Sequence, residues 1–186
     1  MKSKIETHRV GETNINNFGS KIVIVEYRNN KDIDIYFPEY NWTFKHTRCE
    51  YFKRGNIKCP YEPRIYGVGF IGEGKYNTKD NKKCYRMWHG MLQRCYDPYW
   101  CNERPSYRDV IVTKEWYNFQ VFAEWFYEHY YEVENEIMEL DKDTLSGSSK
   151  IYSPETCLIL PHRLNVALIG EKISNKTPET NWLIHV

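Results

Sequence analysis

The sequence of 186 residues lacks several features that would place it in a class at once. No apolar run approaches the roughly 20 residues that a membrane-spanning helix needs. The first ten residues, MKSKIETHRV, contain no apolar segment of the kind found in a secretory signal. We therefore expect a cytoplasmic protein with no membrane partner.

The net charge is small, and closely spaced cysteine pairs are absent. The net charge is +1, which gives no global attraction to nucleic acid or to a membrane surface. No Cys-x-x-Cys pair occurs, so the strongest zinc signature is missing. In the cytoplasm the six cysteines are expected to be reduced, as free thiols, buried thiols or metal ligands.

Aromatic residues and local charge, in contrast, are abundant. The hydrophobic content of 41% is sufficient for a packed core. Residues 75–114 contain nine Lys and Arg against four Asp and Glu, whereas residues 115–143 contain nine Asp and Glu against one Lys. Three interpretations are open. Both segments could be solvated helix faces, the basic segment could hold phosphates, or the acidic segment could dock on a basic groove of another protein. The acidic partner-binding candidates are Glu124, Glu128, Glu132, Glu134 and Glu136.

The first 70 residues have the pattern of a β-rich module. β-Branched residues fill 21–27, and 33–37 alternates apolar and polar side chains after a turn-forming RNNKD, which predicts a hairpin. A small, partly open barrel or SH3-like module fits, followed by a linker over 71–83. The glycines of that region are not a phosphate loop, because Lys75 is followed by Tyr76.

Within this module the stretch 42–64 interleaves basic and aromatic residues, a pattern that can hold phosphates and stack bases. The same aromatic side chains could instead fill the core of the module. The nucleic-acid-binding candidates are Lys45, Arg48, Lys53, Arg54, Lys58 and Arg64.

From Cys84 onward the apolar period is helical. Trp88, Met91, Leu92 and Cys95 share one face of a helix that Pro98 should end. A second apolar stripe runs through 116–130 and is read as core. The segments 137–141 and 157–160 are strand-like, and a helix should follow Pro161 and end at Gly170, which gives a strand–loop–strand–helix order. The second domain is expected over 84–174, with a tail at 175–186, and the whole chain falls in the α+β class.

A ββα unit of this kind can hold one divalent cation between its first strand and its helix. Asp141 on the strand and Asn165 on the helix supply oxygen ligands suited to Mg²⁺ or Mn²⁺, and the chemistry would be phosphodiester hydrolysis. The alternative is that Asp141, Lys142 and Asp143 form a solvated ion-pair cluster that caps the hairpin.

The segments YRMWHGMLQRCYDP, YRDVIVTKEWYNFQVFAEWF and MELDKDTLSGSSKIYSPETCLILPHRLN resemble the HNH-like proteins of phages and mobile elements. The resemblance covers about residues 84–170 and implies an HNH-like, treble-clef-like ββα domain with extra helices. It also implies a bacterial host. By this resemblance Asp141 and Asn165 match two metal ligands, Lys142 stands where the base His belongs, and Thr156 stands where an orienting Asn belongs.

The resemblance therefore implies a degenerate catalytic motif. Lysine has a pKa of about 10.4 and is a poor general base at neutral pH, and loss of a base costs about 10²- to 10⁴-fold in rate. Cys95 and Cys157 match cysteines of the family, and Cys84 could join them in a structural zinc site; buried thiols are the alternative.

Three functions remain open from the sequence. The first is a protein derived from a nuclease, catalytically weak or dead, that binds nucleic acid or a host protein that processes nucleic acid. The second is an anti-CRISPR-like inhibitor that binds a host defence nuclease, such as a CRISPR effector, through its acidic face. The third is an active metal-dependent HNH endonuclease with a variant base.

Overall fold

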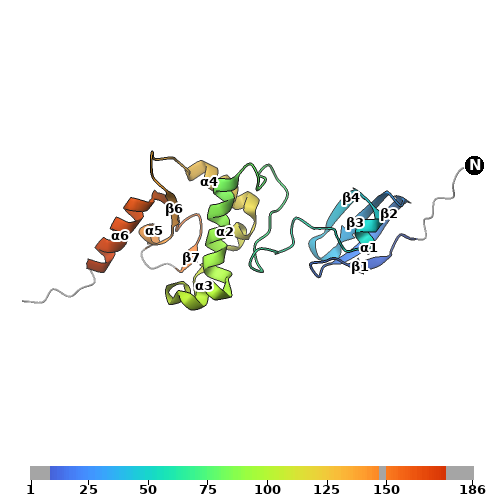
Figure 1. The fold of residues 1–186 in the computed structure, drawn as a ribbon, viewed down its shortest axis with the longest axis horizontal. Helices are drawn as coiled ribbons and strands as arrows, with labels where there is room; N and C mark the ends of the chain where they lie inside the picture. The colour runs from blue at the N-terminus through green and yellow to red at the C-terminus, as the bar shows by residue number, and fades with distance from the viewer. Residues whose placement is uncertain (1–8, 147–149, 175–186) are drawn as a thin grey trace, which may run out of the picture. The chain divides into compact units, whose positions relative to one another are not determined.

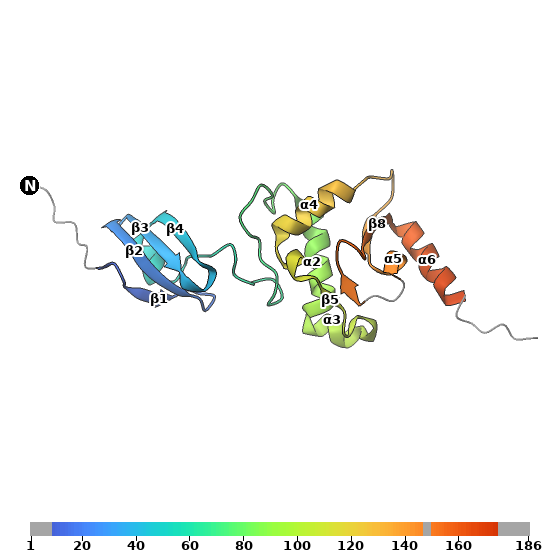
Figure 2. The same cartoon turned by 180° about the vertical axis from the view of Figure 1, so that it is seen from behind.

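The computed structural model describes residues 9–146 and 150–174, and it divides the chain into two compact units. The first unit comprises residues up to Lys75 together with Tyr117–Gln120, and the second comprises Tyr76–Trp116 and the residues from Val121 onward. The expected tail at 175–186 lies outside the described residues. Figure 1 and Figure 2 show the sheet of the first unit and the helices and short strands of the second.

The first unit is built on a four-stranded antiparallel sheet in the order β1-β2-β3-β4. The predicted hairpin is confirmed, since Asn29 at the end of β2 pairs with Asp32 at the start of β3. In the described part of the chain β1 and β4 are edge strands, so the sheet is open. The strands and the following helix are β1 Thr13–Ile15, β2 Lys21–Asn29, β3 Asp32–Phe37, β4 Trp42–Thr47 and α1 Cys49–Lys53.

Alternation along the strands builds the core of this sheet. Ile22 and Ile24 of β2 and Ile33 and Ile35 of β3 are fully buried, and Phe52 of α1 packs with them. The register shifts between Ile24 and Glu26, so that the buried positions of β2 continue at Tyr27. Burial of such apolar side chains is the main stabilisation of the unit.

The first unit also contains a buried polar network. The Asn16 side chain donates to the Ile57 carbonyl over 3.0 Å and also bonds to the buried Glu62 carboxylate. Gly55 beside it has φ +65°, and a Cβ there would lie 2.9 Å from the Ile15 carbonyl oxygen, so this position requires glycine.

The second unit contains two short sheets and a set of helices. The strands β5 Ile111–Val112 and β7 Ile151–Tyr152 pair in parallel, and β6 Met138–Asp141 and β8 Leu158–Pro161 pair in antiparallel. The helices are α2 Lys82–Tyr96, α3 Pro98–Glu103, α4 Phe119–His129, α5 Asp143–Ser146 and α6 His162–Ser174, with short 3₁₀ turns at Pro105–Tyr107 and Lys114–Tyr117. A further 3₁₀ turn, Pro38–Tyr40, lies in the first unit.

Helical periodicity predicted the core of this unit. Trp88 and the other three apolar residues assigned to one face of α2 are all buried, and the Trp88 indole donates to the Trp116 carbonyl over 2.6 Å. Pro98 ends α2 as predicted and also begins α3, where the Asp97 carboxylate accepts the Tyr99 N–H over 3.0 Å. One local prediction was wrong, because α6 continues through Gly170 to Ser174.

The predicted strand–loop–strand–helix order of 137–170 is present as β6, β8 and α6, with α5 and β7 inside the loop. The α+β class is therefore confirmed, whereas the assignment of this segment to the HNH-like fold stays a prediction.

Candidate functional site: a cationic cleft in the second unit

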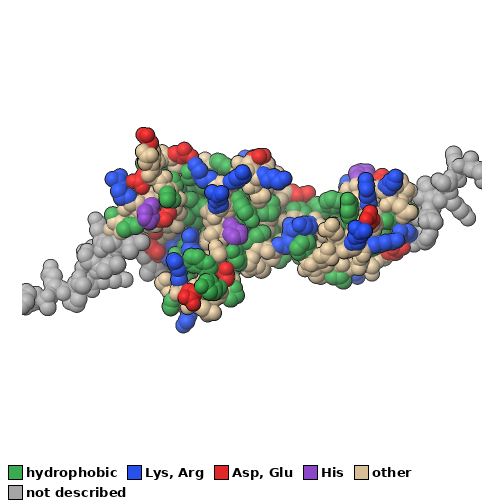
Figure 3. All heavy atoms as spheres, in the orientation of Figure 1, with side chains coloured by type: hydrophobic (Ala, Val, Ile, Leu, Met, Phe, Trp, Pro, Cys, Tyr) green, Lys and Arg blue, Asp and Glu red, His purple; other side chains and the backbone are tan. Residues whose placement is uncertain are grey.

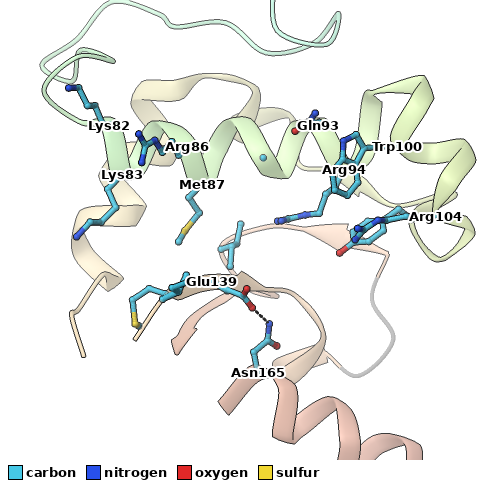
Figure 4. Close-up of a pocket in the computed structure, with 15 residues that line it drawn as sticks. Lys82, Lys83, Arg86, Met87, Gln93, Arg94, Trp100, Arg104, Glu139 and Asn165 are labelled. Carbon is cyan, nitrogen blue, oxygen red and sulfur yellow. Dashed lines mark hydrogen bonds between the residues drawn. The ribbon is translucent and has the colours of Figure 1, made fainter. Parts of the chain in front are cut away.

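A cleft of about 710 Å³ lies in the second unit, with α2 and α3 on one side and β6 and α6 on the other. Figure 4 shows its lining. The volume is within the range of about 300–1,000 Å³ that ligand sites occupy. Five cationic side chains line it: Lys82, Lys83, Arg86, Arg94 and Arg104.

The periodicity of α2 explains why these cations gather. The helix buries Cys84, Trp88 and Leu92 on its core face. At 3.6 residues per turn, Lys82, Arg86 and the residues near position 93 lie on a different face, which lines the cleft. The amphipathic pattern of one helix therefore fixes both the core and the cationic wall.

Most of these cations have no carboxylate partner. Lys83 forms an ion pair with Glu132, and both side chains are exposed. Within the described residues, no carboxylate lies within 4.0 Å of the charged groups of Lys82, Arg86, Arg94 or Arg104. Two of the four lie over aromatic rings instead: the Arg94 guanidinium is 5.6 Å from the Tyr152 ring centroid, and that of Arg104 is 4.3 Å from the Trp100 centroid.

The opposite wall presents a polar group from β6 and α6. The Asn165 amide nitrogen donates to Oε2 of Glu139 over 2.8 Å, as the dashed line in Figure 4 shows. Nδ1 of His162 lies 3.0 Å from Oε1 of the same carboxylate. Both oxygens of Glu139 are therefore engaged, which holds the start of α6 against β6.

The two residues expected to share a divalent cation have separate partners. Oδ2 of Asp141 accepts the backbone N–H groups of Asp143 and Thr144, over 3.1 and 2.7 Å, and so caps α5. Asn165 bonds to Glu139 instead. Asp141 thus has a structural role, while the proposal that it and Asn165 bind a metal stays untested.

The expected solvated cluster around Lys142 is wrong in one respect. Asp141 and Lys142 are buried, with 7% and 9% of their surface exposed. Nζ of Lys142 lies 2.6 Å from Oδ1 of Asp143 and 6.0 Å from the Tyr152 ring centroid. The charged group is held inside the unit by a carboxylate and an aromatic face, which compensates its loss of hydration.

Thr156, at the position matching the orienting Asn, organises the turn before β8. Its hydroxyl donates to the Ile151 carbonyl over 2.8 Å and accepts the Ser153 N–H over 3.0 Å. These bonds satisfy backbone groups between β7 and β8, so the residue holds the loop together.

The zinc candidates are buried thiols. Burial raises the pKa of Cys84 and of Cys95 to about 12 and that of Cys157 to about 11. In residues 9–146 and 150–174, the one group of three His, Cys, Asp or Glu side chains close enough to share a metal is Asp32, Asp34 and His46. Arg28 already bonds to both of those aspartates, at 3.0 Å and 2.9 Å, which offsets part of their charge.

The basic residues predicted in the first unit are dispersed over it. Arg48, Lys53 and Arg54 line a hollow of about 480 Å³ together with Lys31. Lys58 and Arg64 lie over the exposed Phe18 ring, at 5.5 and 5.0 Å from its centroid. Lys45 is exposed on β4. Figure 3 shows several Lys and Arg side chains on one face of this unit.

The aromatic residues of the same stretch divide between core and surface. Phe52 is buried, Trp42 and Tyr61 pack against the core, and Phe44 and Tyr51 are exposed. The core interpretation of 42–64 is therefore confirmed for Phe52, Trp42 and Tyr61, whereas the nucleic-acid interpretation stays a prediction for the exposed rings.

The acidic candidates differ in their partners. Glu124 and Glu128 are exposed one turn apart on α4, and Glu134 is exposed after it. Glu132 pairs with Lys83, and Glu136 pairs with Arg163 over 3.2 Å.

Of the residues that line the cleft, Asn165 was singled out from the sequence, as a metal ligand, but none of the cations was. The sequence feature that could have identified the cations is the excess of basic residues over 75–114, combined with the helical period of 82–96. What the sequence could not supply is the position of β6 and α6 opposite that face.

Within the described residues, no helix has the length and apolar content needed to cross a membrane. Comparison with known proteins found no matching family model, no similar curated protein and no similar solved structure.

Proposed function

We propose that this protein binds nucleic acid and that the cationic cleft of the second unit holds the phosphate backbone. The observation that carries this proposal is the set of four cleft cations without a carboxylate partner in the described residues. Unpaired Lys and Arg side chains on one wall are the electrostatic footprint of phosphate recognition. The resemblance of the second half to HNH-like proteins favours the same ligand.

The dimensions of α2 suit a polyanion. From Lys82 to Arg94 the helix rises about 18 Å at 1.5 Å per residue, which matches several phosphates of one strand. Because the net charge of the chain is +1, attraction is local to the cleft and does not come from the protein as a whole.

The chemistry near β6 supports binding without cleavage. Lys142 stands where a neutral His would act as base, and its ammonium group bonds to Asp143. The carboxylate of Asp141 is engaged with the N–H groups of α5. We therefore expect supercoiled plasmid to remain intact with the protein and Mg²⁺ or Mn²⁺; nicking that is lost in Asp141→Ala would instead establish a metal-dependent endonuclease.

The binding proposal is tested by reversing one cleft charge. Arg86 is exposed and lines the cleft, so Arg86→Glu should weaken binding of a labelled oligonucleotide by about tenfold in fluorescence anisotropy. Lys79→Glu makes the same charge change at an exposed residue outside the cleft lining and is the matched control. Equal losses in both variants would show that the cleft is not the binding site.

A second candidate function rests on α4. Glu124 and Glu128 are exposed one helical turn apart and could dock on a basic groove of a host nuclease, as an anti-CRISPR-like inhibitor would. In a pull-down against purified CRISPR effectors, capture by the wild type that is lost in Glu124→Lys/Glu128→Lys would support this candidate. Capture of none of them, together with oligonucleotide binding that depends on Arg86, would exclude it in favour of the cleft.

A further inference from the structure

The cleft has an aromatic end as well as cationic walls. Trp100 and Tyr107 are half-buried lining residues, and the guanidinium of Arg104 lies 4.3 Å from the Trp100 ring centroid. Figure 4 shows Trp100, Arg94 and Arg104 at one end and the Lys82, Lys83 and Arg86 group toward the other. Phosphates alone need no aromatic surface, whereas unpaired bases stack on aromatic rings and on guanidinium planes.

Two polar atoms on facing walls also lack a partner within the described residues. Nε of Arg94 and Oδ1 of Asn165 are both buried and make no hydrogen bond. A buried donor or acceptor without a partner is unfavourable, so a ligand in the cleft that supplied partners to both atoms would gain affinity. Such a ligand would offer an acceptor to Arg94 and a donor to Asn165, and a nucleotide carries both kinds of group.

Gly90 keeps the middle of the cleft open. It lies on α2 between Arg86 and Arg94, and a Cβ at this position would meet nothing within 4 Å. Glycine is unfavourable in a helix interior, and neither a positive φ nor a close neighbour requires it here. A longer side chain at this position would extend into the space between the two cationic groups.

The shape of the site favours one form of nucleic acid. Duplexes are read by helices or ribbons that project into a groove, but here α2 is the wall of a hollow. A hollow with cations along it and an aromatic surface at one end suits an extended strand whose bases are unpaired.

We propose that the cleft binds single-stranded nucleic acid, with one base stacked at the Trp100–Arg104 end and the neighbouring phosphates on Arg86 and Arg94. This inference rests on the proposed function and adds the form of the ligand to it.

Four probes of roughly 12 nucleotides, within the site sizes of about 4–16 that single-strand binders cover, test the ligand form by anisotropy. They are oligo(dT), oligo(U), a duplex, and an abasic deoxyribose-phosphate strand that has the charge of oligo(dT). Oligo(dT) or oligo(U) should bind more tightly than the duplex, although the duplex carries more charge. The abasic strand should bind roughly 5- to 150-fold more weakly than oligo(dT), as expected for the loss of a stacked base.

The comparison of oligo(dT) with oligo(U) identifies whether DNA or RNA is preferred. A duplex that binds more tightly than both single strands, or an abasic strand that binds as tightly as oligo(dT), would overturn the single-strand inference. The binding proposal itself would still stand if Arg86→Glu weakened every probe, and it would fail if Arg86→Glu affected none.

Variants at the aromatic end and at the glycine locate the strand. Trp100→Ala should weaken oligo(dT) but not the abasic strand, Trp100→Phe should restore most of the affinity, and Tyr99→Ala is the control because Tyr99 is 71% exposed on the same helix. Gly90→Leu should weaken binding by roughly tenfold, whereas Gly90→Ala should not. Equal effects of Trp100→Ala and Tyr99→Ala, or unchanged binding in Gly90→Leu, would contradict the proposed placement.

Discussion

The two units use their cations differently. In the first unit four of five arginines lie within 4.0 Å of a carboxylate: Arg9, Arg28, Arg54 and Arg64. In the cleft of the second unit none of the three arginines has such a partner within the described residues. The interleaved basic and aromatic residues of 42–64 drew attention to the first unit, but the sequence alone does not show which carboxylates fold beside each cation.

The difference extends to how each unit is stabilised. The sheet of the first unit encloses a charged network, in which Arg28 bonds to both oxygens of the buried Asp34 over 2.9 and 3.1 Å. The second unit relies on aromatic packing, where the Trp116 and Trp125 ring centroids are 4.7 Å apart and both rings contact Phe122. The comparison predicts that each unit responds to a different perturbation.

The largest expected effect is on the aromatic core. Trp88 is fully buried, so Trp88→Ala should reduce the free energy of unfolding of the second unit by about 3–5 kcal/mol. Hydrogen exchange should show lost protection in α2 and α4 and unchanged protection in β2 and β3. Equal loss in both units would mean that the two do not unfold separately.

A smaller effect is expected from acid on the first unit. The hydrogen bond from Arg28 lowers the pKa of Asp34 from 3.8 to about 2. Because the pKa of the folded state is below that of the unfolded state, this contribution to stability is complete above about pH 4 and is lost as the pH falls toward 2. It amounts to about 2 kcal/mol.

Urea denaturation between about pH 5 and pH 2 measures this effect. The free energy of unfolding of the wild type should fall more steeply with acid than that of Asp34→Asn, which lacks the titrating carboxyl. Parallel pH profiles for the two proteins would show that the Arg28–Asp34 pair does not carry the dependence.

The cap on α5 should contribute less. Asp141→Ala removes the acceptor for two backbone N–H groups and should cost about 1 kcal/mol, seen as a lower midpoint in chemical denaturation. Asp143→Ala should cost more, because it removes the carboxylate that bonds to the buried Lys142. A midpoint of Asp141→Ala equal to that of the wild type would argue against the capping role.

The smallest effect has the opposite sign. Gly90→Ala should stabilise the second unit by about 0.5–1 kcal/mol, because alanine is favoured in a helix interior and its Cβ meets no neighbour. Thermal unfolding would show a higher midpoint. A lower midpoint would mean that the backbone at this position is constrained in a way the structure does not show.

Periodic segments were predictable from the sequence. The hairpin of β2 and β3, the buried face of α2 and the order of β6, β8 and α6 all follow local apolar patterns. Gly170 lies inside α6 and so has a helical backbone. A glycine ends a helix when it takes the left-handed conformation just after the last helical residue.

The site was less predictable, for a physical reason. Lys142 was expected in solvent beside two acids, but its side chain is buried, with its ammonium group near Asp143 and the Tyr152 ring. The cleft depends on α2 facing β6 and α6, whose residues are more than 40 positions away in the sequence, and on Arg94, Arg104 and Asn165 meeting there. No local pattern encodes that juxtaposition.

The central claim is that unpaired cations of the second unit hold phosphates. The most direct test is the salt dependence of oligo(dT) binding by the wild type and by Lys82→Gln/Arg86→Gln, which removes two exposed cleft cations. Each phosphate contact contributes about 0.7 to the slope of log K against log salt for a single strand. We predict that the double variant has a slope shallower by about 1.4, while Lys45→Gln/Lys53→Gln in the first unit leaves the slope unchanged. A slope that changes only in the first-unit variant would contradict the account.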